Sequence, residues 1–106
     1  MRDKNKLLDE LQNFEFWRKW VRGQQRLRWD LLYLPRPSQN EKQFFLIVGR
    51  VYGAIRREAK KRLGVQEESE GDRILLNKIA ADMMSKFCQE SWEWRERRKA
   101  QKENRQ

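Results

Sequence analysis

A chain of 106 residues with 38% hydrophobic and 39% charged side chains is long enough for one domain with a modest core. Its 25 Lys and Arg side chains outnumber 16 Asp and Glu, so the net charge of +9 favours polyanionic partners, either nucleic acid or an anionic membrane surface. One cysteine and no histidine exclude a disulfide framework, a structural zinc site and a Ser-His or Cys-His nucleophile pair.

The chain lacks the common sequence motifs for catalysis, cofactor binding and membrane insertion. The sequence contains no P-loop and no dinucleotide-binding glycine pattern. Its longest apolar run, residues 44–48, is far shorter than a membrane span of about 20 residues, and the charged N-terminal segment lacks the apolar centre of a signal peptide. We therefore expect no enzyme, no cofactor, no metal ion and no membrane partner. The single Cys88 suits a reducing compartment, so the expected location is the cytoplasm.

The first predicted element covers residues 5–34. Its apolar residues recur at steps of three and four, as in an amphipathic helix, and they include Leu7, Leu11, Phe14, Trp17, Val21, Leu27, Leu31 and Leu34. Gly23 lies inside this segment and is a point where the helix can bend or break. Two prolines in residues 35–40 end the segment, because proline cannot continue a helix.

Two further helices are predicted, over residues 41–63 and 72–102. The second helix has an apolar stripe of Phe44, Val48, Val51, Ile55 and Ala59, and the third has Leu76, Ile79, Ala80, Met83 and Phe87. Asn40 and Asp72 are the expected N-caps, and Gly64 is the expected stop of the second helix. The acidic stretch between the two helices is interpreted as a solvated linker.

The predicted fold is all-α, a small antiparallel bundle of three main helices. Residues 1–94 would form the bundle, and residues 95–106 a basic C-terminal extension that is frayed or disordered. The predicted core consists of Leu11, Phe14, Val48, Val51, Ile55, Leu76, Ile79, Met83 and Phe87. Cys88 is expected to be a buried thiol, and Gly49 and Gly53 are expected to mark close helix packing.

The positive charge is concentrated on two predicted helix faces. Arg18, Arg22 and Arg26 follow each other at intervals of four residues, with Lys19 beside them. On the second helix, Arg50, Arg57 and Lys61 share a face on which only Glu58 is acidic. Such rows either are solvated surfaces of a basic protein or follow the phosphates of a nucleic acid, and we favour the second interpretation.

The sequence also contains five tryptophans and a basic run at its C-terminal end, and both bear on the choice of partner. Trp17 belongs to the apolar stripe and is predicted to be buried, whereas Trp92 and Trp94 cannot both face the core. An exposed tryptophan next to arginine suits either an unpaired base or a protein partner. In the C-terminal run, Arg95 and Arg98 are candidates, although nearby glutamates partly neutralise this segment. We therefore expect the loss of Arg50 and Arg57 to weaken binding more than deletion of residues 99–106.

The sequence chemistry therefore favours a non-enzymatic subunit that binds the phosphate backbone of DNA or RNA, single- or double-stranded. The predicted contact residues are Arg18, Lys19, Arg22, Arg26, Arg50, Arg57, Lys61, Arg95 and Arg98. Protein subunits of an assembly, or further copies of the chain, are also expected partners. The alternative is a phage- or plasmid-type adaptor that occupies an acidic surface of a protein, and a peripheral membrane binder ranks below both.

Two stretches carry a resemblance to a known family. They are the apolar helix at residues 44–55, which contains Gly49 and Arg50, and the Gly71-Asp72-Arg73 turn. In these stretches the chain resembles the small helical subunits of CRISPR effector complexes. The resemblance implies an all-α bundle that holds a nucleic-acid backbone with basic residues inside an antiviral defence complex.

Overall fold

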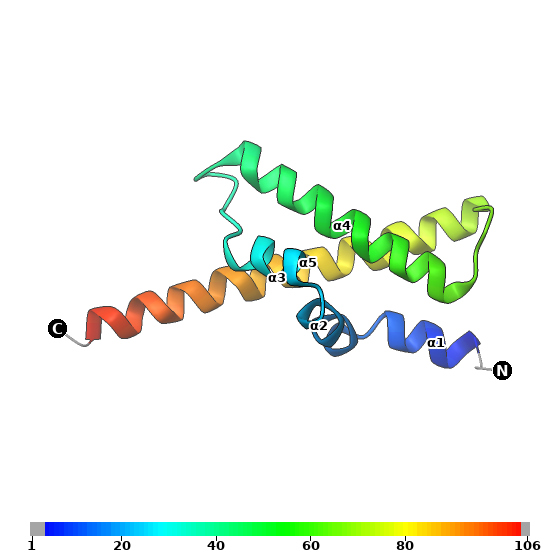
Figure 1. The fold of residues 1–106 in the computed structure, drawn as a ribbon, viewed down its shortest axis with the longest axis horizontal. Helices are drawn as coiled ribbons and strands as arrows, with labels where there is room; N and C mark the ends of the chain where they lie inside the picture. Colours follow the sequence, from blue (N-terminus) through cyan, green and yellow to red (C-terminus); the bar gives the residue numbers. More distant parts are fainter. Residues whose placement is uncertain (1–3, 105–106) are drawn as a thin grey trace.

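Five α-helices lie within residues 4–104, the part of the chain that the computed structural model describes (Figure 1). They are α1 (Lys4–Leu11), α2 (Phe14–Arg22), α3 (Gln25–Leu32), α4 (Glu41–Leu63) and α5 (Glu70–Asn104). The predicted all-α class is confirmed, since no strand occurs within this range. The prediction of three main helices is wrong, because the first segment forms three short helices instead of one.

The two breaks in the first segment have separate causes. Asn13 ends α1 and caps α2, because its side chain accepts a hydrogen bond of 2.9 Å from the backbone N–H of Glu15. Gly23 ends α2, and its N–H donates to the Trp20 carbonyl at 3.1 Å. Trp17 stabilises the first break, because its buried Nε1 donates to the Leu11 carbonyl at 2.7 Å. The break near Gly23 was predicted, whereas the one at Asn13 was not.

The predicted caps of α4 are confirmed, and that of α5 is shifted. Asn40 accepts from the Gln43 N–H at 3.1 Å, and Gly64 ends the helix with a left-handed φ of 70°. Ser69, rather than Asp72, caps α5. The Ser69 hydroxyl accepts from the Asp72 N–H while the Asp72 carboxylate accepts from the Ser69 N–H, both at 3.1 Å.

Helices α4 and α5 form an antiparallel hairpin, and α1–α3 pack across it (Figure 1). Helix α5 continues past residue 94 without a break and projects beyond the other helices. This projection explains the extents of 56 × 28 × 21 Å and the radius of gyration of 15.9 Å. A compact domain of this length would have a radius of gyration of about 13 Å.

The core lies between the hairpin and the three short helices. All the predicted core residues are buried except Phe14 and Val48, which pack against the core while partly exposed. Trp17 and Cys88 are buried as predicted, and burial raises the pKa of the Cys88 thiol. The expected close packing at the glycines is wrong for Gly49, which is exposed and where an added Cβ would meet no other atom within 4 Å.

Candidate functional site

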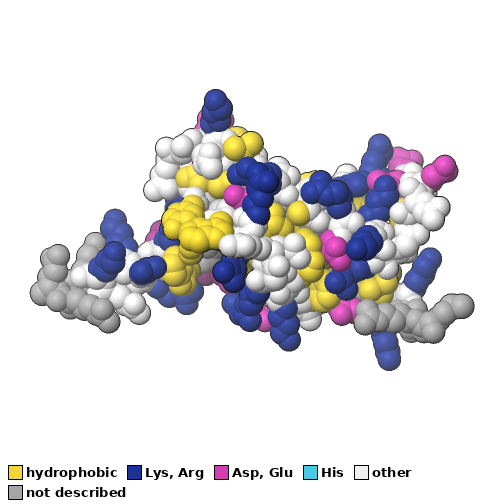
Figure 2. All heavy atoms as spheres, viewed as in Figure 1, with side chains coloured by type: hydrophobic (Ala, Val, Ile, Leu, Met, Phe, Trp, Pro, Cys, Tyr) yellow, Lys and Arg dark blue, Asp and Glu magenta, His cyan; other side chains and the backbone are white. Residues whose placement is uncertain are grey.

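The corner at which α2 meets α3 separates two concave surfaces. One is a hollow of about 370 Å³ between this corner and α4, and the other is a groove of about 910 Å³ between α2, α3 and α5. Lys and Arg side chains are spread over the face of the molecule drawn in Figure 2, with exposed hydrophobic side chains between them. We refer to these two surfaces as the small hollow and the large groove.

The small hollow collects three of the predicted contact residues from two helices. Arg26 of α3 meets Arg57 and Lys61 of α4 around it, and Trp20 forms part of its wall. None of the three cations forms an ion pair with any residue of the described range 4–104. The one carboxylate of this surface, Glu58, is bound by Arg62 at 2.7 Å. The hollow therefore presents an excess of positive charge to solvent.

The break at Gly23 decides which arginines meet. The prediction that Arg18, Arg22 and Arg26 share one helical face is wrong, because the first two lie on α2 and the third lies on α3. Arg26 is turned to the small hollow, whereas Arg18 and Arg22 line the large groove. Charges that would form one row on a straight helix are thus divided between two surfaces.

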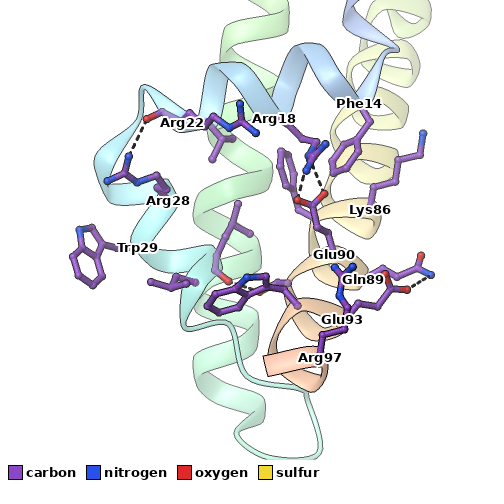
Figure 3. Close-up of a pocket in the computed structure, with 16 residues that line it drawn as sticks. Phe14, Arg18, Arg22, Arg28, Trp29, Lys86, Gln89, Glu90, Glu93 and Arg97 are labelled. Atoms are coloured by element: carbon purple, nitrogen blue, oxygen red, sulfur yellow. Dashed lines mark hydrogen bonds and ion pairs between the residues drawn. The ribbon is translucent and has the colours of Figure 1, made fainter. Parts of the chain in front are cut away.

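The large groove combines cations with aromatic rings (Figure 3). Its cations come from all three helices and are Arg18, Arg22, Arg28, Lys86 and Arg97. Its two carboxylates are Glu90, toward which Arg18 points in Figure 3, and Glu93, which accepts a hydrogen bond from Gln89 at 3.1 Å. Trp29 and Trp94 also line the groove, and their exposed fractions are 49% and 40%.

Arg18 is largely neutralised inside the protein. Its guanidinium donates to Glu15 one turn earlier and to Glu90 of α5 at 3.1 Å. The hydrogen bond to Glu15, followed by the charge of Glu90, raises the pKa of Arg18. Arg18 therefore ties α2 to α5, and its capacity for a further anion is small.

Arg50 is likewise paired, contrary to the expectation that only Glu58 lies near this face. Its Nη2 donates to Oδ1 of Asp30 at 3.2 Å, and its Nε lies 3.2 Å from Oδ2. The side chain of Asp30 is only 13% exposed. Arg50 therefore joins α4 to α3, and the surface charge of α4 comes from Arg57 and Lys61.

The other three predicted contact residues line neither concave surface. Lys19 is exposed on α2. Arg98 lies over the Trp94 ring, with 5.3 Å between the guanidinium carbon and the ring centroid. Arg95 is half-buried beside Arg36, and burial together with that neighbouring charge lowers the pKa of Arg95.

A second charged cluster closes the turn between α4 and α5. Glu68 accepts hydrogen bonds from Arg56 and, at 3.1 Å, from Lys60. The bond from Arg56, followed by that from Lys60, lowers the pKa of Glu68 to about 2. The acidic stretch expected to be a solvated linker is thus held to α4 at Glu68.

Sequence reasoning missed four cations and left open whether Trp20 and Trp29 are buried or exposed. Arg28, Lys86 and Arg97 line the large groove, and Arg62 neutralises Glu58. Lys86 and Arg97 lie on α5, whereas Arg28 lies on α3 and Arg62 on α4, so no single helical period connects the four. The interleaving of Trp29 with Arg26 and Arg28 could have indicated Arg28.

None of the described helices carries an apolar stretch long enough to cross a bilayer. Comparison with known proteins finds no matching family model, no matching curated protein and no matching solved structure.

Proposed function

We propose that this protein is a non-enzymatic subunit that binds the phosphate backbone of nucleic acid at the α2–α3 corner. The observation that carries the proposal is the meeting of Arg26, Arg57 and Lys61 around the small hollow without a free carboxylate. Guanidinium groups form paired hydrogen bonds with phosphate oxygens, and lysine adds a mobile charge. An assembly such as the CRISPR effector complexes, whose small subunits the sequence resembles, is one setting for this activity.

The distribution of charge supports a backbone contact. Among the cations that pair inside the protein, Arg18 and Arg50 join helices and Arg56 holds the turn between α4 and α5. The cations at the small hollow form no ion pair within the described range 4–104 and can bind a partner. Three like charges held close together repel each other, and a bound polyanion removes this repulsion. Such contacts add affinity without reading the base sequence.

The test is a salt series of binding to single- and double-stranded DNA and RNA of mixed sequence. If each of the three cations at the small hollow neutralises one phosphate, log K should fall against log salt with a slope of about −2 to −3. In the double variant Arg57→Gln, Lys61→Gln, the slope should become shallower by about 2. The matched control is Lys42→Gln with Lys78→Gln, which removes the same charge from exposed positions outside both concave surfaces.

A slope that is equal in the two double variants would mean that net charge alone attracts the nucleic acid. Binding that does not change with salt would overturn the proposal outright.

A second candidate function is an adaptor that binds the acidic surface of another protein. The exposed neighbours Phe45 and Leu46 on α4 favour it, because 58% and 53% of their surfaces are open to solvent. Apolar side chains of this kind suit the centre of a protein interface surrounded by basic residues.

A further inference from the structure

The rim of the large groove holds two tryptophan rings whose orientations are fixed by neighbouring side chains. Trp29 of α3 stacks on Tyr33, with ring centroids 5.5 Å apart and planes inclined by only 9°. On α5, Trp94 is covered on one side by the Arg98 guanidinium at 5.3 Å. Both indoles are nevertheless exposed by two-fifths or more of their surface. Each ring is therefore held in place while part of it stays open.

A parallel Trp–Tyr stack on a helix surface is an apolar platform that the fold itself does not bury. Tyr33 is 62% exposed, so the pair adds little to the core. A nucleic-acid base can extend such a stack by one more flat ring. Because Tyr33 already orients the indole, less side-chain entropy is lost when the base binds.

The cations of the large groove complement a strand of phosphates. Once the Arg18–Glu90 pair is set aside, Arg22, Arg28, Lys86 and Arg97 face the single carboxylate of Glu93. None of these four forms an ion pair with a residue of the described range. Lys86 and Arg97 are eleven residues apart on α5, which corresponds to about 16 Å along the helix. Charge is thus spread along the groove, as a backbone that runs through it would require.

We infer that the large groove binds single-stranded nucleic acid, with unpaired bases stacked on Trp29 and Trp94 and phosphates bound by Arg22, Arg28, Lys86 and Arg97. This inference rests on the proposed function and specifies its ligand. In a duplex, the base faces are already stacked on each other and do not reach these rings. An acidic protein would satisfy the cations but would not need the flat Trp29–Tyr33 stack.

The experiment compares Trp29→Leu and Trp94→Leu with the wild-type protein and with Trp29→Phe, which retains an aromatic ring. The control is Phe45→Leu, which removes an exposed aromatic ring from α4 outside the groove. Fluorescence anisotropy at one salt concentration measures binding to oligo(dT), oligo(U), a DNA duplex of the same length and poly-glutamate. Circular dichroism establishes that each variant is folded.

Each leucine variant should weaken binding to the single strands by about 5-fold or more and leave duplex binding within about 2-fold. Trp29→Phe should retain most of the affinity, Phe45→Leu all of it, and single strands should quench the indole fluorescence of the wild-type protein. An equal loss of affinity for single strands and duplex, or no loss for either, would overturn the inference. Neither result would change the salt-dependent contribution of Arg57 and Lys61 to binding. Equal weakening of poly-glutamate binding would assign the groove to an acidic protein instead. Failure of every nucleic acid to bind would overturn the proposed function as well.

Discussion

Arg50 of α4 and Asp30 of α3 form an ion pair across two helices, with Nη2 and Oδ1 3.2 Å apart. The two partners differ in exposure, since 33% of the Arg50 side chain reaches solvent and only 13% of the Asp30 side chain does. An arginine that the sequence places on a binding face therefore acts as a structural contact. Its removal tests folding more directly than binding.

The unequal exposure predicts an unequal effect on stability. Arg50→Ala should lower the free energy of unfolding by about 1–3 kcal/mol, because it leaves the mostly buried Asp30 carboxylate without a partner. Asp30→Ala should cost less, since the long Arg50 side chain can turn to water. Urea denaturation of both single variants and the double variant measures the difference. Equal losses would show that Asp30 reaches water as readily as Arg50.

Acid should weaken the Glu68 cluster. Because its folded pKa of about 2 lies below the unfolded value of about 4.3, Glu68 stabilises the fold above pH 4.3, and this contribution is lost as pH falls toward 2. Glu68→Gln should therefore reduce the dependence of stability on pH across this window. Urea midpoints between pH 5 and pH 2 measure it. Glu67→Gln is the control, and a control curve as flat as that of Glu68→Gln would contradict the assignment.

Alanine should change the stability of the fold in opposite directions at Gly49, inside α4, and at Gly64, the residue that ends this helix. Gly64→Ala should destabilise the fold by about 1 kcal/mol, because φ is 70° at this position. Gly49→Ala should stabilise it by about 0.5–1 kcal/mol, because alanine favours the helix and its Cβ would meet no atom within 4 Å. Thermal denaturation followed by circular dichroism compares the two. A Gly64→Ala variant as stable as the wild-type protein would contradict a left-handed backbone at Gly64, and a destabilised Gly49→Ala variant would contradict open space beside Gly49.

The buried indole of Trp17 should matter through its hydrogen bond as well as its volume. Trp17→Phe leaves the Leu11 carbonyl without its 2.7 Å donor and should cost about 1–3 kcal/mol of unfolding free energy. Trp20→Phe, at a partly buried position, should cost less than about 1 kcal/mol. Chemical denaturation measures both losses. If the two are equal, the contact between α1 and α2 does not depend on this hydrogen bond.

The small hollow should contribute more to binding than the C-terminal end of α5. Arg26→Ala with Arg57→Ala removes two cations carried by packed helices, so less backbone entropy is lost there when phosphate binds than at the projecting end of α5. We expect this variant to lose more affinity for nucleic acid than a chain that ends at residue 98. Filter binding at one salt concentration compares them. Greater loss in the shortened chain would transfer the contact to the end of α5.

The local features of this protein were readable from the sequence because they depend on neighbouring residues. The all-α class follows from apolar residues repeated every three or four positions, and the ends of α4 follow from the side chain of Asn40 and the backbone freedom of Gly64. Burial of Trp17 follows from the same periodicity, whereas that of Cys88 was expected because no base lies near its thiol in the sequence. The break at Asn13 escaped this reasoning, since the apolar spacing continues across it and the hydrogen bond from Trp17 to Leu11, which supports the Asn13 cap, spans six residues.

The use of each charge was decided by tertiary structure. Arg50 looks as free in the sequence as Arg26 and Arg57, yet its carboxylate partner Asp30 lies 20 residues away. Arg18 has Glu15 one turn earlier on its own helix, but its second partner, Glu90, lies 72 residues away. Arg26 meets Arg57 and Lys61 only because the chain turns at Gly23 and packs α3 against α4. Helical spacing determines which side chains share a face of one helix. Local spacing accounts for the pairs within one helix, Arg18–Glu15 and Arg62–Glu58. The pairs that join different helices depend on tertiary packing, and no local pattern contains that information.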